Sequence, residues 1–437
     1  MPDNQIAKFP LKIGSDRRHL VDQNDRPFLV HGDTAWSIIT ALTKAEAEQY
    51  LANRAAKGFN ALIVNLIEHK FNGPLTRQGD APFTDLHDLS TPNERYWAHA
   101  DWVLKKSAEY GFLVFLAPLY LGARTPKNDE GWFVEALTTG VRGCREYGRF
   151  LGRRYANQVN LIWMMGGDRN PGDCQEHTFA VVRGIKEFDS RHLFTAHPAP
   201  EFPTVDVYGS GNWLDFNNTY TYGIIHRKLL ADYNREPATP FVLIESIYEG
   251  EHNSTPVQIR RQAYWAILCG AAGQFLGNNP IWAFWPDWQA AMDAEGSRSM
   301  AHLKQLFGSR PWHSLIPDQF SAKPWFELDF ASEKRVVVDG LGEQRGLDFL
   351  ASAYTSDRRT LIAYMPTART VTVDLSQLFG DSKRGWWFNP RTGETQSTGL
   401  IPGQGLLKFT PPADGDWVLV VDDAAANLPA PGQSKTY

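Results

Sequence analysis

Short apolar runs alternate with longer amphipathic stretches between residue 25 and about residue 305 of the chain. The eight runs are Phe28–Val30, Ala61–Leu66, Phe112–Leu116, Leu161–Met165, Leu193–Ala196, Asp215–Tyr220, Phe241–Ile244 and Gly273–Leu276. Several of them are almost continuously apolar, which is typical of parallel strands buried on both faces. Eight such strands separated by helices predict an α/β chain built as a (β/α)8 TIM barrel rather than an open doubly wound sheet.

The stretches between the runs carry helix start and stop signals. Thr43 followed by Glu46 matches a capping box, and Gly58 is placed to end that helix before the second run. Thr255 followed by Pro256 gives an N-cap and a first-turn proline after the seventh run. No GxGxxG or GxxxxGK[ST] motif follows the first run, which argues against a nucleotide-binding fold.

The pattern changes near Leu315, where runs such as RTLIAYMP, RTVTVDL and DWVLVVDD lie close together between turn residues. They predict a small antiparallel β-sandwich. We therefore expect a catalytic barrel with an N-terminal hairpin over residues 1–312, a β-sandwich accessory domain over 313–425 and a flexible tail over 426–437. The segments IPDQF and SAKPW are the expected linker, and we expect the sandwich to pack on the barrel and brace it.

Composition and charge exclude several classes of protein. The 437 residues include 44 basic and 49 acidic side chains, which gives a net charge of −5 and no electrostatic footprint for a nucleic-acid partner. No run approaches about 18 apolar residues and the N-terminus lacks a signal-peptide core, which predicts a cytoplasmic protein with no membrane partner. Cys144, Cys174 and Cys269 are too few for a disulfide scaffold and are expected to be buried. The oligomeric state is left open.

Two of the predicted strands end in a carboxylate, where the catalytic groups of a (β/α)8 barrel project. Asp168 follows LIWMMGG and Glu245 follows FVLI. Two carboxylates about 5–5.5 Å apart suit a retaining glycosidase, and about 6.5–9.5 Å suits an inverting one. A carboxylate after a strand can instead cap the next helix, and this alternative applies to Asp168 in particular.

Other strand ends supply hydrogen-bonding groups and flat rings, which suit the hydroxyl groups and the faces of a sugar. The candidates for hydroxyl recognition are Asp33, Asn65, His197, Asn218 and Tyr220, and the candidates for stacking walls are Trp36, Trp282 and Trp285. Together these residues predict a carbohydrate-binding pocket at one end of the barrel.

A metal centre is the rival use of some of the same residues. His31, Asp33, His69 and His197 carry side chains that bind divalent ions in barrel metallohydrolases. The chain has no HxH after its first predicted strand and no His/Asp pair at a familiar spacing, so we predict no metal and no cofactor. A serine nucleophile is not expected, because the GxSxG motif that forms the nucleophile turn of α/β-hydrolases does not occur.

Several longer motifs follow one another along nearly the whole chain. They are HGDTAW, GGDRNP, HPAP, ESIYEG, RRQAYWAILCGAAGQFLGNN, WWFNPRTGE and FTPPADGDWVLV. Together they resemble the DUF4038 glycoside hydrolases, which are the apiosidase-like barrels of family GH140 joined to a β-sandwich labelled "putative collagen-binding domain of a collagenase". The resemblance implies a retaining glycosidase with the acid/base in the GGD motif and the nucleophile in the ESxYEG motif. In this sequence those residues are Asp168 and Glu245. The broader clan has Asn-Glu where Gly167-Asp168 stands, so the expected acid has a shorter side chain.

The expected function is therefore retaining hydrolysis of a plant-derived oligosaccharide or glycoside, with a carbohydrate as the partner. Activity on apiose in rhamnogalacturonan-II is what the named family members imply. Two alternatives stay open: a metal-dependent barrel hydrolase, which a chelator would inactivate, and a non-catalytic carbohydrate-binding protein, which need not keep both carboxylates. The identity of the sugar, its linkage and anomeric configuration, and exo or endo action do not follow from the sequence.

Overall fold

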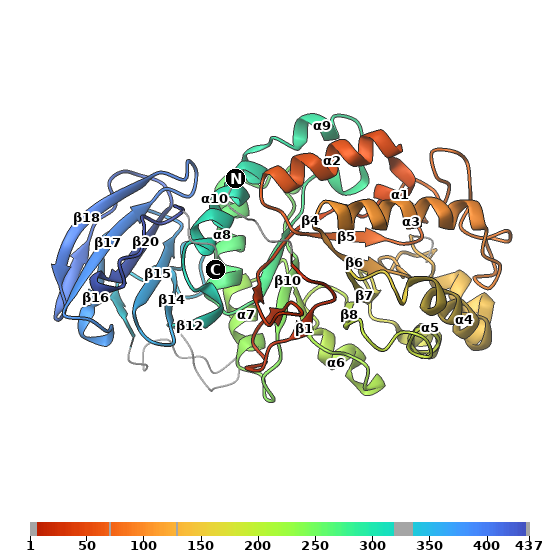
Figure 1. Cartoon of the computed structure of the whole chain (residues 1–437), viewed down its shortest axis with the longest axis horizontal. Coiled ribbons are helices and arrows are strands. Elements are labelled where there is room, and N and C mark those ends of the chain that lie inside the picture. Colours follow the sequence, from red (N-terminus) through yellow and green to blue (C-terminus); the bar gives the residue numbers. More distant parts are fainter. Residues whose placement is uncertain (1–6, 70, 128–129, 319–334, 434–437) are drawn as a thin grey trace. The chain divides into compact units, whose positions relative to one another are not determined.

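The computed structural model of the chain describes residues 7–69, 71–127, 130–318 and 335–433 (Figure 1). The predicted linker from residue 319 onward and the last four residues of the predicted tail lie outside them. Contacts between Cα atoms divide the chain into two compact units. The first unit is Met1–Ser15, Leu20–Tyr220 and Gly277–Met292, and the second is Asp16–His19, Thr221–Leu276 and Asp293–Tyr437. Within the described part, every helix is too short or too polar to cross a lipid bilayer.

The N-terminal segment forms a small antiparallel sheet of β1 (Lys12–Ile13), β2 (Leu20–Val21) and β3 (Pro27–Phe28). The first barrel strand is β4 (Val30–Thr34), so the predicted strand Phe28–Val30 was placed too early. The error has a physical cause, because His31, Asp33 and Thr34 are polar and yet fully buried in this strand.

The predicted fold class is confirmed, since eight parallel strands alternate with helices along the chain. Their order in the sheet is β8-β7-β6-β5-β4-β11-β10-β9. After β4 they are β5 (Ala61–Asn65), β6 (Leu113–Ala117), β7 (Leu161–Gly166), β8 (Phe194–His197), β9 (Asn217–Tyr220), β10 (Phe241–Glu245) and β11 (Gly273–Leu276). Each of these seven strands lies within two residues of its predicted run, because short runs that alternate with longer amphipathic stretches favour covered parallel strands.

Side chains join β8 and β9, the two strands at the ends of this order. Asn218 Nδ2 donates to Thr195 Oγ1 at 3.0 Å and to the carbonyl of Ala196 at 2.8 Å. Thr195 Oγ1 in turn donates to the carbonyl of Phe216 at 3.1 Å. Asn218 therefore helps to close the sheet into a barrel.

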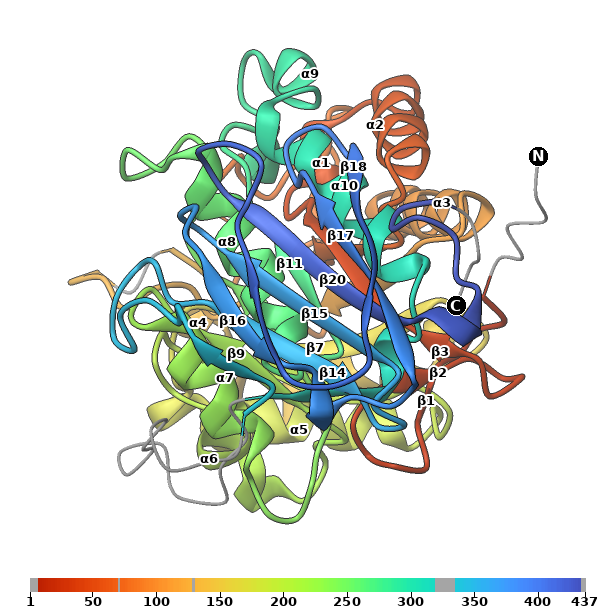
Figure 2. The same cartoon turned by 90° about the vertical axis from the view of Figure 1, so that its left-hand side faces the viewer.

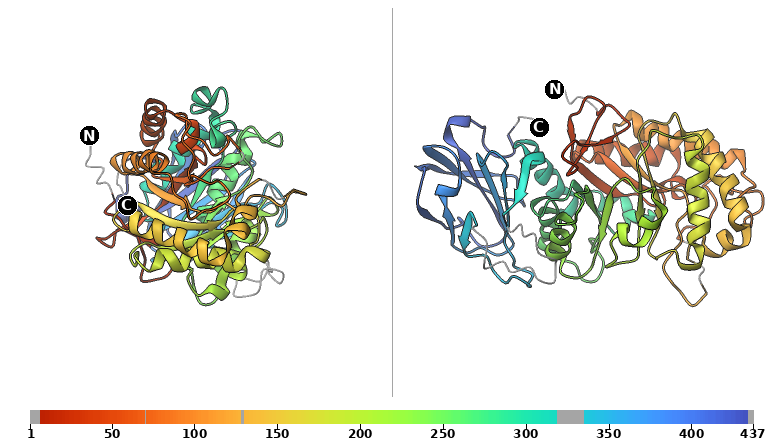
Figure 3. Two further views of the ribbon diagram at one scale, coloured as in Figure 1. Left: turned by 90° about the vertical axis from the view of Figure 1, so that its right-hand side faces the viewer. Right: turned by 90° about the horizontal axis from the view of Figure 1, so that it is seen from below.

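The helices between the strands are α1 (Ile38–Ala41), α2 (Lys44–Ala56), α3 (Glu94–Glu109), α4 (Phe133–Tyr155), α5 (Gln175–Lys186), α6 (Thr204–Tyr208), α7 (Ile225–Tyr233), α8 (Pro256–Leu268), α9 (Trp288–Ala291) and α10 (Glu295–Gly308). The two helices for which start signals were predicted, α2 and α8, begin at them. Thr43 and Glu46 form a complete capping box at α2, and Thr255 caps α8. Helices α4 and α5 pack side by side (Figure 3).

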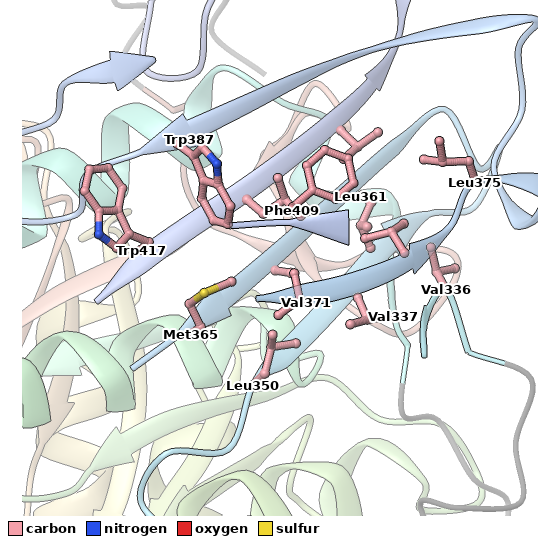
Figure 4. Close-up of a cluster of buried hydrophobic side chains, with 14 of the residues drawn as sticks. Val336, Val337, Leu350, Leu361, Met365, Val371, Leu375, Trp387, Phe409 and Trp417 are labelled. Atoms are coloured by element: carbon pink, nitrogen blue, oxygen red, sulfur yellow. The ribbon is translucent and has the colours of Figure 1, made fainter. Parts of the chain in front are cut away.

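The C-terminal part consists of two antiparallel sheets. One sheet has the order β12-β14-β15-β20-β17-β18 (Figure 2) and the other the order β13-β16-β19. The strands are β12 (Leu315–Pro317), β13 (Val337–Asp339), β14 (Ala351–Thr355), β15 (Thr360–Met365), β16 (Val371–Asp374), β17 (Ser382–Phe388), β18 (Thr395–Pro402), β19 (Leu406–Phe409) and β20 (Trp417–Asp423). Buried side chains from both sheets, among them Leu361, Val371, Trp387 and Phe409, share one apolar cluster, as in a β-sandwich (Figure 4).

Within the second unit, helix α8 packs against the sandwich through polar and aromatic contacts. Arg260 Nε donates to Asp416 Oδ2 at 2.7 Å, and both side chains are buried. The rings of Tyr264 and Tyr364 stack with their centroids 4.6 Å apart. Trp265 Nε1 donates to the carbonyl of Phe349 at 3.0 Å. The sandwich is thus fastened to a barrel helix by buried contacts.

The three cysteines are free and buried, as predicted. Burial raises the pKa of the Cys144 and Cys174 thiols to about 12, and it also raises the pKa of Cys269. A thiol that stays protonated at neutral pH is a poor nucleophile, so these side chains serve the packing.

Candidate active site

Asp168 follows β7 in a turn that requires the two preceding glycines. Gly166, Gly167 and Asp168 have φ values of +81°, +136° and +53°. A Cβ at Gly167 would lie 2.0 Å from the ring of Tyr120, and a Cβ at Gly166 would lie 2.3 Å from the hydroxyl oxygen of Tyr208. Glycine is therefore needed at both positions for the backbone conformation and for space. The GGD sequence turns the chain sharply at the strand end and lets Tyr120 pack directly on it.

The Asp168 carboxyl group has two polar neighbours in the first unit. The Tyr120 hydroxyl donates to Asp168 Oδ2. His197 Nδ1 lies 3.7 Å from Asp168 Oδ1 and accepts from the Asp168 backbone N–H at 3.4 Å. The Asp168 side chain keeps 24% of its surface exposed, so a substrate can reach it. A carboxyl group that is fixed on one side and open on the other suits general acid and base catalysis. Asp168 does not occupy the capping position of the next helix, because the N-cap residue of α5 is Cys174.

Seven rings form a continuous row beside Asp168. The successive centroid distances are 4.8 Å from Tyr220 to His197, 5.5 Å from His197 to Trp36, 5.6 Å from Trp36 to Tyr120, 5.4 Å from Tyr120 to Phe71, 4.7 Å from Phe71 to Trp282 and 4.8 Å from Trp282 to Trp285. Trp36 is 4% exposed at the inner part of the row, and Trp285 is 37% exposed at its outer end. The structure thus brings five of the predicted binding residues, His197, Tyr220, Trp36, Trp282 and Trp285, into one wall. Phe71 was missed, because an isolated phenylalanine outside a strand gives no signal in the sequence.

Asn65 belongs to a buried polar network centred on Glu68, another residue that sequence reasoning missed. Ser37 Oγ donates to Glu68 Oε2 at 2.5 Å, and the backbone N–H of His69 donates to Oε1 at 3.1 Å. Asn65 Nδ2 lies 3.5 Å from the same Oε1 and its backbone N–H donates to the carbonyl of Trp36 at 2.9 Å. Glu68 therefore ties the loop that carries Trp36 to the loop after β5. The carboxylate in NLIEH was the available signal.

Burial raises the pKa of the Glu68 carboxyl group to about 7, although the hydrogen bonds from Ser37, His69 and Asn65 lower it. Since this pKa lies above the ordinary value of 4.5, folding takes up a proton between about pH 4.5 and pH 7. The stability of the folded chain should therefore fall as the pH rises through this window, by about 3 kcal/mol from this group. We expect Glu68→Gln to remove that pH dependence.

Denaturant unfolding of the wild type and of Glu68→Gln at pH 5 and pH 8 measures this effect. The matched control is Glu343→Gln, which removes an exposed carboxylate and should leave the wild-type pH dependence unchanged. Equal pH dependence in all three proteins would show that Glu68 ionises like an exposed glutamate.

Two predicted binding residues lie in the interior with structural partners. Asp33 accepts from the Tyr50 hydroxyl at 2.7 Å and forms an ion pair of 2.5 Å with Arg54. Asn218 joins β9 to β8 as described above. Both side chains are fully buried, so the structure gives them roles in holding the barrel together.

The four residues of the metal alternative each have a different partner in the first unit. The His31 ring stacks on Phe59, and Asp33 pairs with Arg54. His69 Nε2 lies 3.2 Å from Glu135 Oε1, and His197 contacts Asp168. These contacts distribute the four side chains among separate parts of the first unit.

Glu245 ends β10 in the second unit, and the whole strand is buried. The Tyr222 hydroxyl donates to Glu245 Oε1 at 3.1 Å, while the glutamate itself is 7% exposed. Glu249, the next carboxylate along the chain, instead accepts from the backbone N–H of Gly296 at 2.7 Å in the first turn of α10. Of these two glutamates, Glu245 is the one at a strand end, where a barrel places catalytic groups.

A family model described as "Apiosidase-like, catalytic domain" matches residues 14–314. The chain belongs to this apiosidase-like family. A second model, described as "Putative collagen-binding domain of a collagenase", matches residues 335–422. Curated protein sequences give no significant match.

Two solved structures resemble nearly the whole of this apiosidase-like chain. One, described as "Glycoside hydrolase", is 25% identical and covers 96% of this chain and 97% of its own, with a TM-score of 0.82. The other is a glycoside hydrolase family 5 protein from Bacteroides vulgatus ATCC 8482, 24% identical over 95% of this chain and 94% of its own, also with a TM-score of 0.82. This apiosidase-like chain is a glycosidase, and its substrate is a carbohydrate.

Proposed function

We propose that the chain is a retaining glycoside hydrolase that acts on a plant-derived oligosaccharide or glycoside of the apiosidase-like kind. Glu245 is the nucleophile and Asp168 is the acid and base. The observation that carries the proposal is the setting of Asp168 at the end of β7, whose carboxyl group accepts a hydrogen bond from Tyr120 and whose side chain is 24% exposed. Glu245 ends another strand of the same parallel sheet, and such ends share one edge.

In this mechanism the Glu245 carboxylate attacks the anomeric carbon while Asp168 donates its proton to the leaving oxygen. Asp168, now ionised, then takes a proton from a water molecule, whose oxygen displaces Glu245 from the sugar. Tyr222 fixes one oxygen of the nucleophile. Tyr120 fixes one oxygen of Asp168, which stabilises the ionised form that acts as the base.

The ring row supports a short sugar substrate. Its inner rings, Trp36, His197 and Tyr220, are almost fully buried, whereas Trp285 at the outer end is exposed. Rings of this kind pack against the apolar faces of sugars. One sugar unit can lie among the inner rings while the remainder of the substrate extends along Trp282 and Trp285.

A panel of aryl glycosides that includes an apioside and arabinofuranosides tests this function, with EDTA present throughout. We expect at least one compound to be hydrolysed at a rate that EDTA leaves unchanged, and early NMR spectra to show the released sugar with its original anomeric configuration. Release of the opposite anomer would contradict the retaining mechanism. Loss of activity in EDTA, restored by a divalent ion, would favour the metal-dependent alternative.

A further inference from the structure

A pocket of about 690 Å³ in the first unit lies along helix α5, apart from the residues assigned to catalysis. Its lining comes from one face of α5, from Arg145 on α4 and from the segment Ser210–Trp213. The volume falls within the range of about 300–1,000 Å³ that is usual for small-molecule sites.

The floor of the pocket contains a buried hydrogen-bond donor. Trp213 and Phe179 are 5% and 6% exposed, and their ring centroids lie 6.1 Å apart. The Trp213 ring also lies against Phe194 and Tyr208. Among the described residues, no acceptor lies within hydrogen-bonding distance of Trp213 Nε1. A buried donor without a partner is costly, and an acceptor atom on a ligand would remove that cost.

A glycine packs directly against this donor. A Cβ at Gly211 would lie 2.2 Å from Trp213 Nε1 and 3.0 Å from Phe179 Cζ, so any other residue would crowd the indole N–H. Gly209, two residues earlier, has no atom of the described chain within 4 Å of its Cβ position. An added side chain at Gly211 would therefore displace the indole N–H, whereas one at Gly209 would meet open space.

Both carboxylates of the pocket lining are paired with arginines, and the one lysine donates to a backbone carbonyl. Arg145 forms an ion pair of 2.7 Å with Glu187, and Arg183 forms one of 3.3 Å with Glu176. Lys186 Nζ donates to the carbonyl of Trp213 at 3.3 Å. Exposed ion pairs of this kind attract an ionic ligand only weakly, and their groups can still form hydrogen bonds with a neutral one.

The remaining lining is uncharged and, apart from Val182 and Gly211, polar. Gln175 Nε2 lies 3.3 Å from Ser210 Oγ at the rim, and Asn212 adds a second amide. Aromatic rings below and amides and hydroxyls above are the groups that bind the apolar face and the hydroxyls of a sugar. We propose that this pocket binds a neutral saccharide unit, one oxygen of which accepts a hydrogen bond from the indole N–H of Trp213. The proposal stands independently of the catalytic roles of Asp168 and Glu245.

The indole N–H resonance of Trp213 in the full chain reports directly on this contact. Its assignment comes from Trp213→Phe, which keeps an aromatic ring and removes the N–H. The probes are arabinose, galactose and rhamnose as neutral sugars and galacturonate as an anionic one. We expect at least one neutral sugar to shift the Trp213 resonance saturably at millimolar concentration.

Gly211→Ala and Gly209→Ala form a matched pair of variants. We expect Gly211→Ala to weaken the binding at Trp213 by about tenfold or more, since the methyl group blocks one hydrogen bond, and Gly209→Ala to leave it unchanged. If Gly211→Ala lowers the melting temperature, Gln175→Ala is the second test, because it changes the pocket lining away from Trp213. We expect Gln175→Ala to weaken sugar binding as well. A Trp213 resonance that no neutral sugar shifts, or that galacturonate alone shifts, would overturn the proposal. So would equal binding by the wild type and both Gly211→Ala and Gln175→Ala.

Discussion

Replacement of Glu245 by glutamine should abolish hydrolysis and leave the chain folded. Glutamine has nearly the same shape and can still accept the hydrogen bond from Tyr222, but its amide oxygen is too weak a nucleophile to form a glycosyl ester. We expect kcat on the best aryl glycoside to fall by about 10³-fold or more. The melting temperature and the circular dichroism spectrum should stay close to those of the wild type.

Glu249→Gln is the matched control for this variant. Glu249 lies four residues further along, and its carboxylate accepts from the first turn of α10. We expect this variant to keep its activity and to lose a small amount of stability, because a charge that favours the helix N-terminus is removed. If Glu245→Gln kept a tenth or more of the wild-type rate, or if Glu249→Gln lost as much as Glu245→Gln, the nucleophile would have to be assigned elsewhere.

Replacement of Asp168 by asparagine should slow hydrolysis to an extent that depends on the leaving group. Removal of a general acid costs about 10²- to 10⁴-fold when the leaving oxygen needs a proton. A nitrophenolate leaves without one, so the first step with such a substrate should be almost unaffected. Steady-state and pre-steady-state rates on an alkyl and a nitrophenyl glycoside of the same sugar measure this difference.

Tyr120→Phe separates the catalytic role of Asp168 from its positioning. The variant keeps the ring that packs on Gly167 and removes the hydroxyl that donates to Asp168. We expect a loss of about tenfold, from one hydrogen bond to a charged group, and similar losses for both leaving groups. Equal losses for both leaving groups in Asp168→Asn itself would show that Asp168 shapes the site and transfers no proton.

The barrel strands could be predicted because the apolar residues that are buried in each strand are neighbours in the sequence. LVFLA and LIWMMG have no polar side chain to expose, so they must be covered on both faces. The strand β4 was misplaced because its polar residues find partners far along the chain, such as Arg54 for Asp33. Glu68 was missed for a similar reason, because its hydrogen-bond donor Ser37 lies 31 residues away in the sequence.

Partners that lie far apart in the sequence also determine what the motifs do. RRQAYWAILCG is one of the longest stretches that carry the family resemblance, and in the structure its Arg260, Tyr264 and Trp265 hold the sandwich. The carboxylates Asp168 and Glu245 could be picked out because a strand end is a local feature. The sequence could not show whether Asn218 contacts a sugar or the neighbouring strand. Its partner Thr195 lies on β8, the strand across the barrel seam.

The buried contacts of the second unit bear on how such a chain can evolve. Arg260 and Arg310 reach from the barrel to Asp416 and Asp422 of the sandwich, and all four side chains are buried. A gene that lost its sandwich segment would encode a barrel in which the face of α8 that carries Tyr264 and Trp265 is uncovered to water, with the apolar surface of both rings exposed. Recombination that swaps this accessory domain for another would meet the same obstacle. The two segments should therefore be inherited together, and a homologue that lacks the sandwich should have polar residues in place of Tyr264 and Trp265.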